Sequence, residues 1–123
     1  MWKDGGITEA KEYAILTNEI YKEWSEMTAK EYKQFKGLRK ENLRDNMDNI
    51  ELILTDLSEE TTKRLAVKRK PKGLEKNIEV ARLGGKVAKN TRDNIEDLLG
   101  ESVVISDNKL DYQYTNVEEI ENK

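Results

Sequence analysis

The sequence has no cysteine and no histidine among its 123 residues. Without thiols there is no disulfide framework and no cysteine nucleophile, and without imidazoles there is no histidine base. The two absences together exclude a Cys/His zinc site. We therefore expect a protein that is not an enzyme, with no catalytic residues, no metal, no cofactor and no small-molecule substrate.

Carboxylates are the main remaining acid–base groups, and helix capping accounts for those that stand close together. Asp45 falls three residues after Asn42, which is the spacing of a helix-start box. Glu59 and Glu60 fit the positive end of a helix dipole. A metal site or an acid pair built on these residues is therefore not expected.

Apolar residues are scarce as well. Leu, Ile, Val and Phe make up 23% of the chain, just above the roughly 20% below which chains tend to stay disordered. No apolar run reaches the roughly 18 residues of a membrane span, and the first residues, Met-Trp-Lys-Asp-Gly-Gly, do not resemble a signal peptide. The expected protein is soluble and cytoplasmic, with a thin core and no contact with a membrane.

What the sequence does contain is helical periodicity. Apolar residues recur at spacings of three and four in five stretches, at about 8–26, 28–37, 42–57, 58–69 and 74–99. The segment Thr28-Ala-Lys-Glu31 is a capping box at the start of the second stretch, and Ser58 is the expected N-cap of the fourth. These patterns predict an all-α domain of about five helices.

The ends of this domain are set by weaker signals. The domain covers residues 8–115, with a flexible leader at 1–7 and an acidic, frayed tail at 116–123. The run Val103-Val104-Ile105 is prone to form a strand but is too brief to specify a sheet alone. A two-stranded β fringe near residues 103–114 therefore stays open.

Gly84 and Gly85 interrupt the last predicted helix. Adjacent glycines cost about 1 kcal/mol each in a helix interior, so they require a reason. The reason is a helix break, a close crossing of another helix, or the approach of a phosphate. A Walker phosphate loop needs a glycine where Val80 stands and a serine or threonine where Val87 stands. We therefore expect close backbone approach at Gly84 and Gly85.

The net charge of −3 conceals a strong segregation of charge. Residues 1–62 carry a net charge of −5, residues 63–92 of +9 and residues 93–123 of −7. Such asymmetry marks a surface for nucleic acid or for an acidic protein. The alternative is that the cations dock on the acidic flanks of the same chain or form a solvated face. We call the cations of the middle segment the basic island: Lys63, Arg64, Lys68, Arg69, Lys70, Lys72, Lys76, Arg82, Lys86, Lys89 and Arg92.

Part of the basic island forms a row. Four of its members recur at helical spacing and therefore share one helix face: Arg82, Lys86, Lys89 and Arg92. Such a row can follow a phosphate backbone. No aromatic residue lies between Phe35 and Tyr112, which disfavours single-strand binding by base stacking.

Six segments, in their order and spacing, carry a family resemblance: Tyr13-Ala-Ile-Leu-Thr-Asn-Glu-Ile-Tyr21, Met27-Thr-Ala-Lys-Glu-Tyr32, Lys36-Gly-Leu38, Asn42-Leu-Arg-Asp-Asn-Met47, Ala81-Arg-Leu-Gly-Gly-Lys-Val-Ala88 and Leu99-Gly-Glu-Ser-Val-Val104. They resemble the C-terminal half of the bacterial DNA-damage-inducible protein D family, which is related to phage antirepressor (BRO-type) proteins. Family members carry a preceding antirepressor-like domain that this sequence lacks. The sequence is therefore expected to be a fragment, a truncated homologue or an excised domain.

The resemblance implies a regulatory role in the bacterial DNA-damage (SOS) response, in modulation of recombination or repair. It implies no known enzyme activity and supplies no catalytic residues. Together with the basic island, it predicts binding to DNA or to a DNA-bound recombination or repair protein. The alternative is an antirepressor-like protein-interaction or oligomerisation domain without direct DNA contact. One apolar stripe is expected to be a core face of the chain or, with so few apolar residues, to complete a core across a homodimer: Leu43, Met47, Ile50, Leu54 and Leu57.

Overall fold

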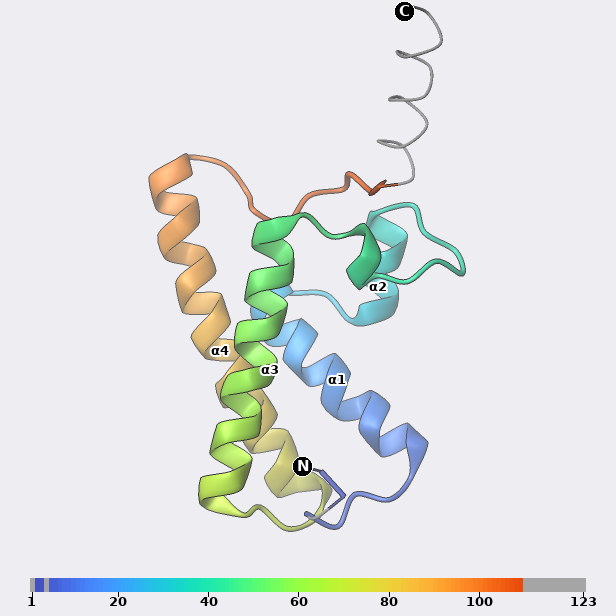
Figure 1. The fold of residues 1–123 in the computed structure, drawn as a ribbon, viewed down its shortest axis with the longest axis vertical. Helices are drawn as coiled ribbons and strands as arrows, with labels where there is room; N and C mark the ends of the chain where they lie inside the picture. Colours follow the sequence, from blue (N-terminus) through green and yellow to red (C-terminus); the bar gives the residue numbers. More distant parts are fainter. Residues whose placement is uncertain (1, 4, 110–123) are drawn as a thin grey trace, which may run out of the picture.

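The computed structural model describes residues 2, 3 and 5–109. Within these residues the chain forms four α-helices: α1 (Ala10–Ser25), α2 (Ala29–Phe35), α3 (Asn49–Arg69) and α4 (Gly73–Leu99). A 3-10 turn, η1 (Arg44–Asn46), precedes α3, and the described residues contain no strand. The all-α prediction is confirmed (Figure 1). No helix in the described part is long and apolar enough to cross a membrane.

The third and fourth predicted helices are one continuous helix, α3. Asp48 caps it, because the Asp48 carboxylate accepts a hydrogen bond from the Glu51 amide at 2.9 Å and the Glu51 side chain accepts one from the Asp48 amide at 3.1 Å. Ser58, which the sequence predicts as an N-cap, lies buried inside α3. Its hydroxyl donates to the Thr55 carbonyl at 2.7 Å. This back-bond within the helix satisfies the serine without ending the helix.

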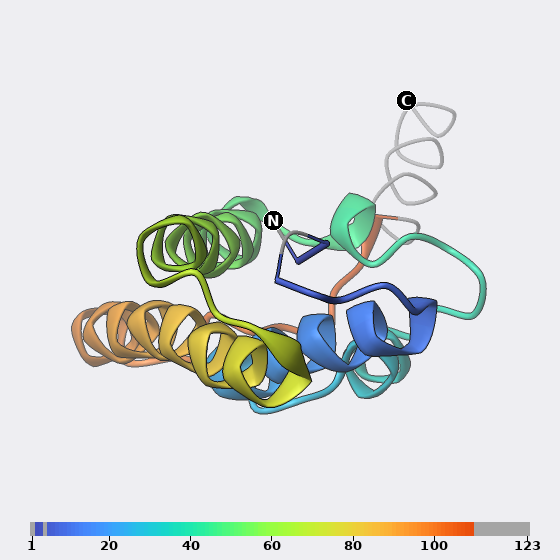
Figure 2. The ribbon, with the colours of Figure 1, turned by 90° about the horizontal axis from the view of Figure 1, so that it is seen from below.

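The two other long helices, α1 and α3, both pack against α4. Figure 1 shows α3 and α4 extending upward from the turn that joins them, antiparallel in chain direction, and Figure 2 shows α4 lying against both α3 and α1. The core between them is small, as the low apolar content predicts. Its fully buried apolar side chains include Leu16 and Trp24 of α1, Leu54 of α3, and Ala81 and Ala88 of α4.

Gly84 and Gly85 lie where α4 touches its two neighbours. A Cβ atom at Gly84 would overlap the Thr62 hydroxyl and lie 2.7 Å from the Ser58 carbonyl oxygen, both on α3. A Cβ atom at Gly85 would lie 2.6 Å from the Glu23 Cβ of α1. The helix continues through both glycines. The glycine pair thus allows close helix crossing, and α4 has no break there.

A buried ion pair fastens α2 and α3 to the segment that follows α4. The side chains of Lys36 and Glu51 are fully buried, and Lys36 Nζ lies 2.8 Å from Glu51 Oε1. Lys36 Nζ also donates to the carbonyls of Ile105 at 2.9 Å and Asp107 at 2.8 Å, and the Tyr32 hydroxyl donates to Glu51 Oε2. Buried charges need such partners, because an unpaired one costs several kcal/mol.

The N-terminal segment packs against the helices, in contrast to the flexible leader that the sequence predicts. Ile7 is fully buried in the core, and the Trp2 ring lies 5.9 Å from that of Tyr13. The backbone amide of Gly73 donates to the Gly5 carbonyl at 2.8 Å. Sequence periodicity starts at residue 8 and therefore gives no sign of these contacts.

The expected β fringe is absent from the part of it that is described. Residues 103–109 contain no strand, and Val103 and Val104 are buried against the core. Burial of their side chains explains the apolar run without a sheet. Residues 110–114 of the expected fringe and the expected tail at 116–123 lie outside the described residues.

Replacing Gly84 with alanine should lower the free energy of unfolding by about 1 to 3 kcal/mol, the usual cost of overpacking. Alanine has a higher helix propensity than glycine, which alone would stabilise α4 by about 1 kcal/mol. A lower stability of the variant would therefore come from the steric overlap. Urea unfolding measures it. Asn90→Ala, at an exposed position of the same helix, is the control and should not destabilise the protein. Equal stability of the two variants would contradict the close crossing.

Candidate nucleic-acid interface

The structure divides the basic island into cations that are engaged in ion pairs and cations that are not. On α4, Arg82 Nε lies 3.0 Å from Glu19 Oε2 of α1. Lys89 Nζ lies 2.8 Å from Glu26 Oε1, at the end of α1, and 2.7 Å from Asp93 Oδ1. The hydrogen bonds that Lys89 Nζ donates to the Asp93 and Glu26 carboxylates raise the pKa of Lys89. These cations dock on acidic neighbours of the same chain.

Arg92 is engaged more deeply than the other cations of α4. Its side chain is only 12% exposed, its Nε lies 2.9 Å from Glu96 Oε2, and its guanidinium donates to the Trp24 carbonyl at 3.1 Å. Glu96 Oε2 also accepts from the Val103 amide at 2.9 Å. Arg92 therefore ties α4 to α1 and, through Glu96, to the segment after α4. It is a packing residue in this fold.

The predicted row on α4 is consequently not a continuous cationic face. Of its four members, three make ion pairs, and the fourth, Lys86, is exposed without an ion pair among the described residues. The alternative left open by the sequence, docking on acidic neighbours, describes Arg82, Lys89 and Arg92. Periodicity identified a shared helix face but carried no information about which residues that face meets.

The C-terminal half of α3 and its C-cap residue, Lys70, carry a cluster of five exposed cations. Their side chains make no ion pair with any described residue. At 100° per residue they spread around the end of α3 and form a cationic end. Arg64 and Lys68, four residues apart, share one side of it. We call this group the α3 cations: Lys63, Arg64, Lys68, Arg69 and Lys70.

The start of α4 extends this charge. Lys72 is the exposed N-cap residue of α4, and Lys76 is exposed and lies 3.9 Å from Glu79 in the first turns. Residues 63–76 carry seven basic side chains and one acidic one, Glu75. The basic side chains outnumber the acidic ones here, so this end of the hairpin carries a net positive charge.

The N-terminal segment fixes the turn between α3 and α4. Lys70 ends α3 in the left-handed region, with φ of 49°, and Pro71 follows. The side-chain amide of Asn77 donates to the Gly73 carbonyl at 2.8 Å, next to the hydrogen bond from the Gly73 amide to the Gly5 carbonyl. These contacts bring exposed Lys3, two residues before Gly5, into the same region. Lys3 is not a member of the basic island, because the sequence predicts residues 1–7 as a flexible leader apart from the helices.

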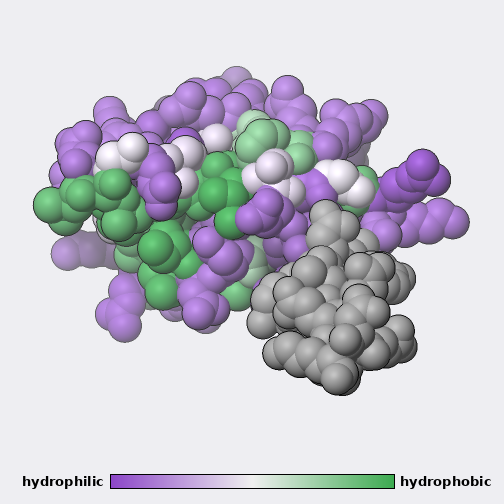
Figure 3. Space-filling view, turned by 90° about the horizontal axis from the view of Figure 1, so that it is seen from above, coloured by the Kyte–Doolittle hydropathy of each residue, from purple (hydrophilic) through white to green (hydrophobic). Residues whose placement is uncertain are grey.

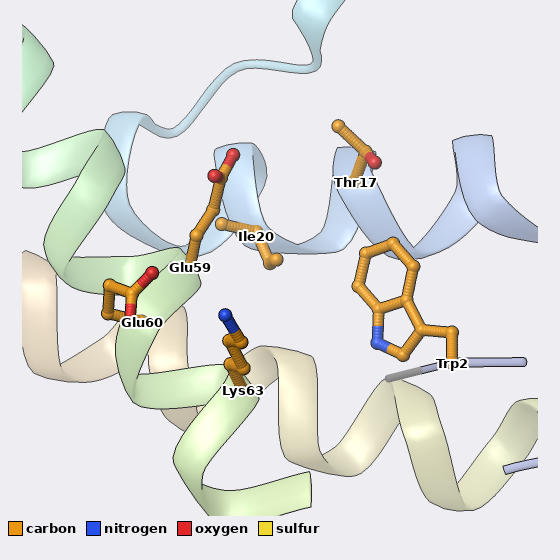
Figure 4. A pocket seen from close by; sticks show the side chains of 6 residues that line it. All are labelled: Trp2, Thr17, Ile20, Glu59, Glu60 and Lys63. Carbon is orange, nitrogen blue, oxygen red and sulfur yellow. The ribbon is translucent and has the colours of Figure 1, made fainter. Parts of the chain in front are cut away.

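Two hollows border the α3 cations. One, of about 340 Å³, is lined by Trp2, Thr17, Ile20, Glu59, Glu60 and Lys63. Figure 4 shows that α3 contributes its charged side chains and α1 supplies Thr17 and Ile20. Its two carboxylates make it unsuitable for a phosphate. The second hollow, of about 370 Å³, lies between α3 and α4 and is lined by Arg69, Pro71, Lys76, Glu79, Val80 and Leu83.

Glu59 and Glu60 lie in the interior of α3, and not at the positive end of a helix dipole as the sequence predicts, because α3 begins at Asn49 and continues through Ser58. Asp48 caps α3, and Glu59 lies 2.8 Å from Arg44. The Asp45 amide donates to Asn42 Oδ1 at 3.0 Å, as the helix-start spacing predicts. Across residues 2, 3 and 5–109, no group of three His, Cys, Asp or Glu side chains is placed to hold a metal ion.

Comparison of the chain with protein-family models, with curated proteins and with solved structures finds no match. The resemblance to the DNA-damage-inducible protein D family stays a prediction from the sequence segments that carry it.

The ion pair between Arg92 and Glu96 should make the stability of the fold depend on pH. Burial raises the pKa of the Glu96 carboxyl, but the hydrogen bonds from Val103 and Arg92 outweigh burial and leave the pKa below its ordinary value. Glu96→Gln should therefore lower the free energy of unfolding by about 1 kcal/mol at neutral pH. A carboxyl with a lowered folded-state pKa stabilises the fold above its unfolded pKa and loses this effect as pH falls through the folded one.

The measurement is urea unfolding of both proteins between neutral and acid pH. The difference between wild type and Glu96→Gln should stay constant down to about pH 4.3 and shrink below it. Asp97→Asn, at an exposed neighbouring position, is the control and should show a smaller difference. A deficit in Glu96→Gln that persists unchanged in acid would contradict the assignment.

Proposed function

We propose that this protein is a non-enzymatic regulatory module of the bacterial DNA-damage (SOS) response that modulates recombination or repair by contacting DNA through the α3 cations. The observation that carries the proposal is the cluster of five exposed cations, without ion pairs among the described residues, at one end of the helix hairpin. The sequence resemblance supports the pathway, and the cationic end supports the nucleic-acid partner.

The physical basis of this contact is counterion release. Each phosphate that a lysine or arginine neutralises releases a counterion from the DNA, and it adds about 0.9 to the slope of log affinity against log salt. Ion pairs reduce this effect for Arg82 and Lys89, since their charges are already compensated by carboxylates at 3.0 and 2.8 Å. The contact therefore belongs to α3 and the turn, rather than to the row on α4.

The contact is with the backbone and not with stacked bases. The residues of α3 from Lys63 onward, the turn and the first turns of α4 include no aromatic side chain. Base stacking on aromatic rings is a main source of single-strand affinity. Binding should therefore be independent of sequence and strongly sensitive to salt.

A second candidate, protein interaction or oligomerisation without DNA contact, is favoured by a different observation. The stripe that the sequence offers for a homodimer is used within the chain, since Leu43, Met47 and Leu54 are buried. Apolar side chains are exposed instead at the opposite end of the hairpin, where Ile53 is 62% and Leu98 88% exposed. Figure 3, viewed from above, shows apolar surface gathered over the C-terminal end of α4.

The DNA contact is tested by fluorescence anisotropy with a short labelled duplex and two matched double variants. Arg64→Gln/Lys68→Gln removes two α3 cations, whereas Arg82→Gln/Lys89→Gln removes the same charge from paired positions. The first should reduce the magnitude of the salt slope by about 1.8 and weaken binding at low salt. The second should leave the slope close to that of the wild type.

Two results would overturn the proposal. One is the absence of any duplex binding by the wild-type protein at about 50 mM salt, where phosphate contacts are strong. The other is an equal loss of affinity in the two double variants, because it would mean that only net charge matters. Circular dichroism of each variant checks that the helices are retained.

A further inference from the structure

We infer that the hollow between the end of α3 and the first turns of α4 binds an acidic peptide segment that inserts one apolar side chain. This goes beyond the proposed DNA contact: the partner differs, and although both sites use Arg69, the apolar side chain of Leu83 decides affinity only in this hollow. We call this hollow the α3–α4 groove. Its lining combines an apolar floor with cationic edges, whereas the proposed DNA contact relies on cations alone.

The floor of the α3–α4 groove is apolar and already formed. Val80 is 4% exposed at its base, and Leu83 is 38% exposed on its wall. Pro71 contributes a rigid ring from the turn that the N-terminal segment holds in place. The volume of about 370 Å³ lies at the lower end of the range for ligand pockets. The groove is therefore suited to a single apolar side chain and its flanking backbone.

The edges of the groove specify the charge of the partner. Arg69 stands on one side at the end of α3, without an ion pair among the described residues, and Lys76 stands on the α4 side. The one acidic lining residue, Glu79, lies 3.9 Å from Lys76, and both side chains are largely exposed. An exposed pair of this kind contributes little. A carboxylate from a partner can therefore bind Lys76 in place of Glu79.

Charge complementarity thus selects an acidic peptide with an apolar anchor. Arg64 and Lys68 lie on another side of α3 from Arg69, by helical geometry, and add to the positive field that steers an acidic segment towards the groove. A nucleic acid matches the cations but offers no aliphatic side chain to Leu83. The groove likewise has no aromatic ring on which a base stacks.

The test uses two labelled synthetic peptides and fluorescence anisotropy with the intact protein. One peptide carries a single leucine flanked by Asp and Glu, and the other is identical except that serine replaces the leucine. The leucine peptide should bind about tenfold more tightly, since burying the leucine side chain adds to the charge interaction. Equal binding of the two peptides would overturn the inference, because charge alone would then account for the binding.

A matched pair of variants locates the site. Leu83→Ser alters the groove, and Val87→Ser alters a side chain of similar exposure, 42%, one turn further along α4 and outside the lining. Leu83→Ser should weaken the leucine peptide about tenfold, and Val87→Ser should leave it unchanged. Equal effects in the two variants would overturn the inference. Circular dichroism confirms that both remain folded.

Duplex binding, measured in parallel, separates this inference from the proposed function. Leu83→Ser should bind the labelled duplex as the wild type does, because the DNA contact uses no apolar side chain. Failure of the wild type to bind duplex would overturn the proposed function and leave the peptide result standing. If Leu83→Ser loses duplex and peptide affinity together, the groove is not a separate site and the inference is wrong.

Discussion

The contact of the α4 backbone with two other helices is the constraint on which the rest of this fold depends. Gly84 meets Ser58 and Thr62 of α3, and Gly85 meets α1 at Glu23. With few large apolar residues available, the protein gains cohesion from short distances between backbones, where dispersion contacts are dense. The hairpin of α3 and α4, and hence the position of the cationic end, follows from this crossing.

The same packing sorts the charges. Because α4 lies along α1, cations on that side meet the carboxylates of Glu19 and Glu26. The end of α3 lies beyond this contact and keeps its cations exposed. The basic island of the sequence is thus divided into two regions in space. In one region the cations pair with carboxylates of the same chain, and in the other they are exposed without ion pairs among the described residues.

Local features of this fold were predictable from sequence, and long-range ones were not. The Thr28–Glu31 capping box is present as its spacing predicts, since capping involves only neighbouring residues. The prediction that Ser58 is an N-cap was wrong, because a serine hydroxyl can either cap a helix or donate a hydrogen bond to a carbonyl within one. Nothing in the sequence distinguishes Lys36 from a surface lysine. Its burial depends on Glu51 and on carbonyls some 70 residues away in the chain.

Lysine acetylation of the folded protein with and without duplex DNA, read by mass spectrometry, tests the contact of the α3 cations with DNA most directly. Duplex should lower the acetylation of Lys63, Lys68 and Lys70, which are exposed at the end of α3. Acetylation of Lys89 should not change, because its amine already binds two carboxylates. Protection of Lys89 with no protection at the end of α3 would contradict a DNA contact through the α3 cations.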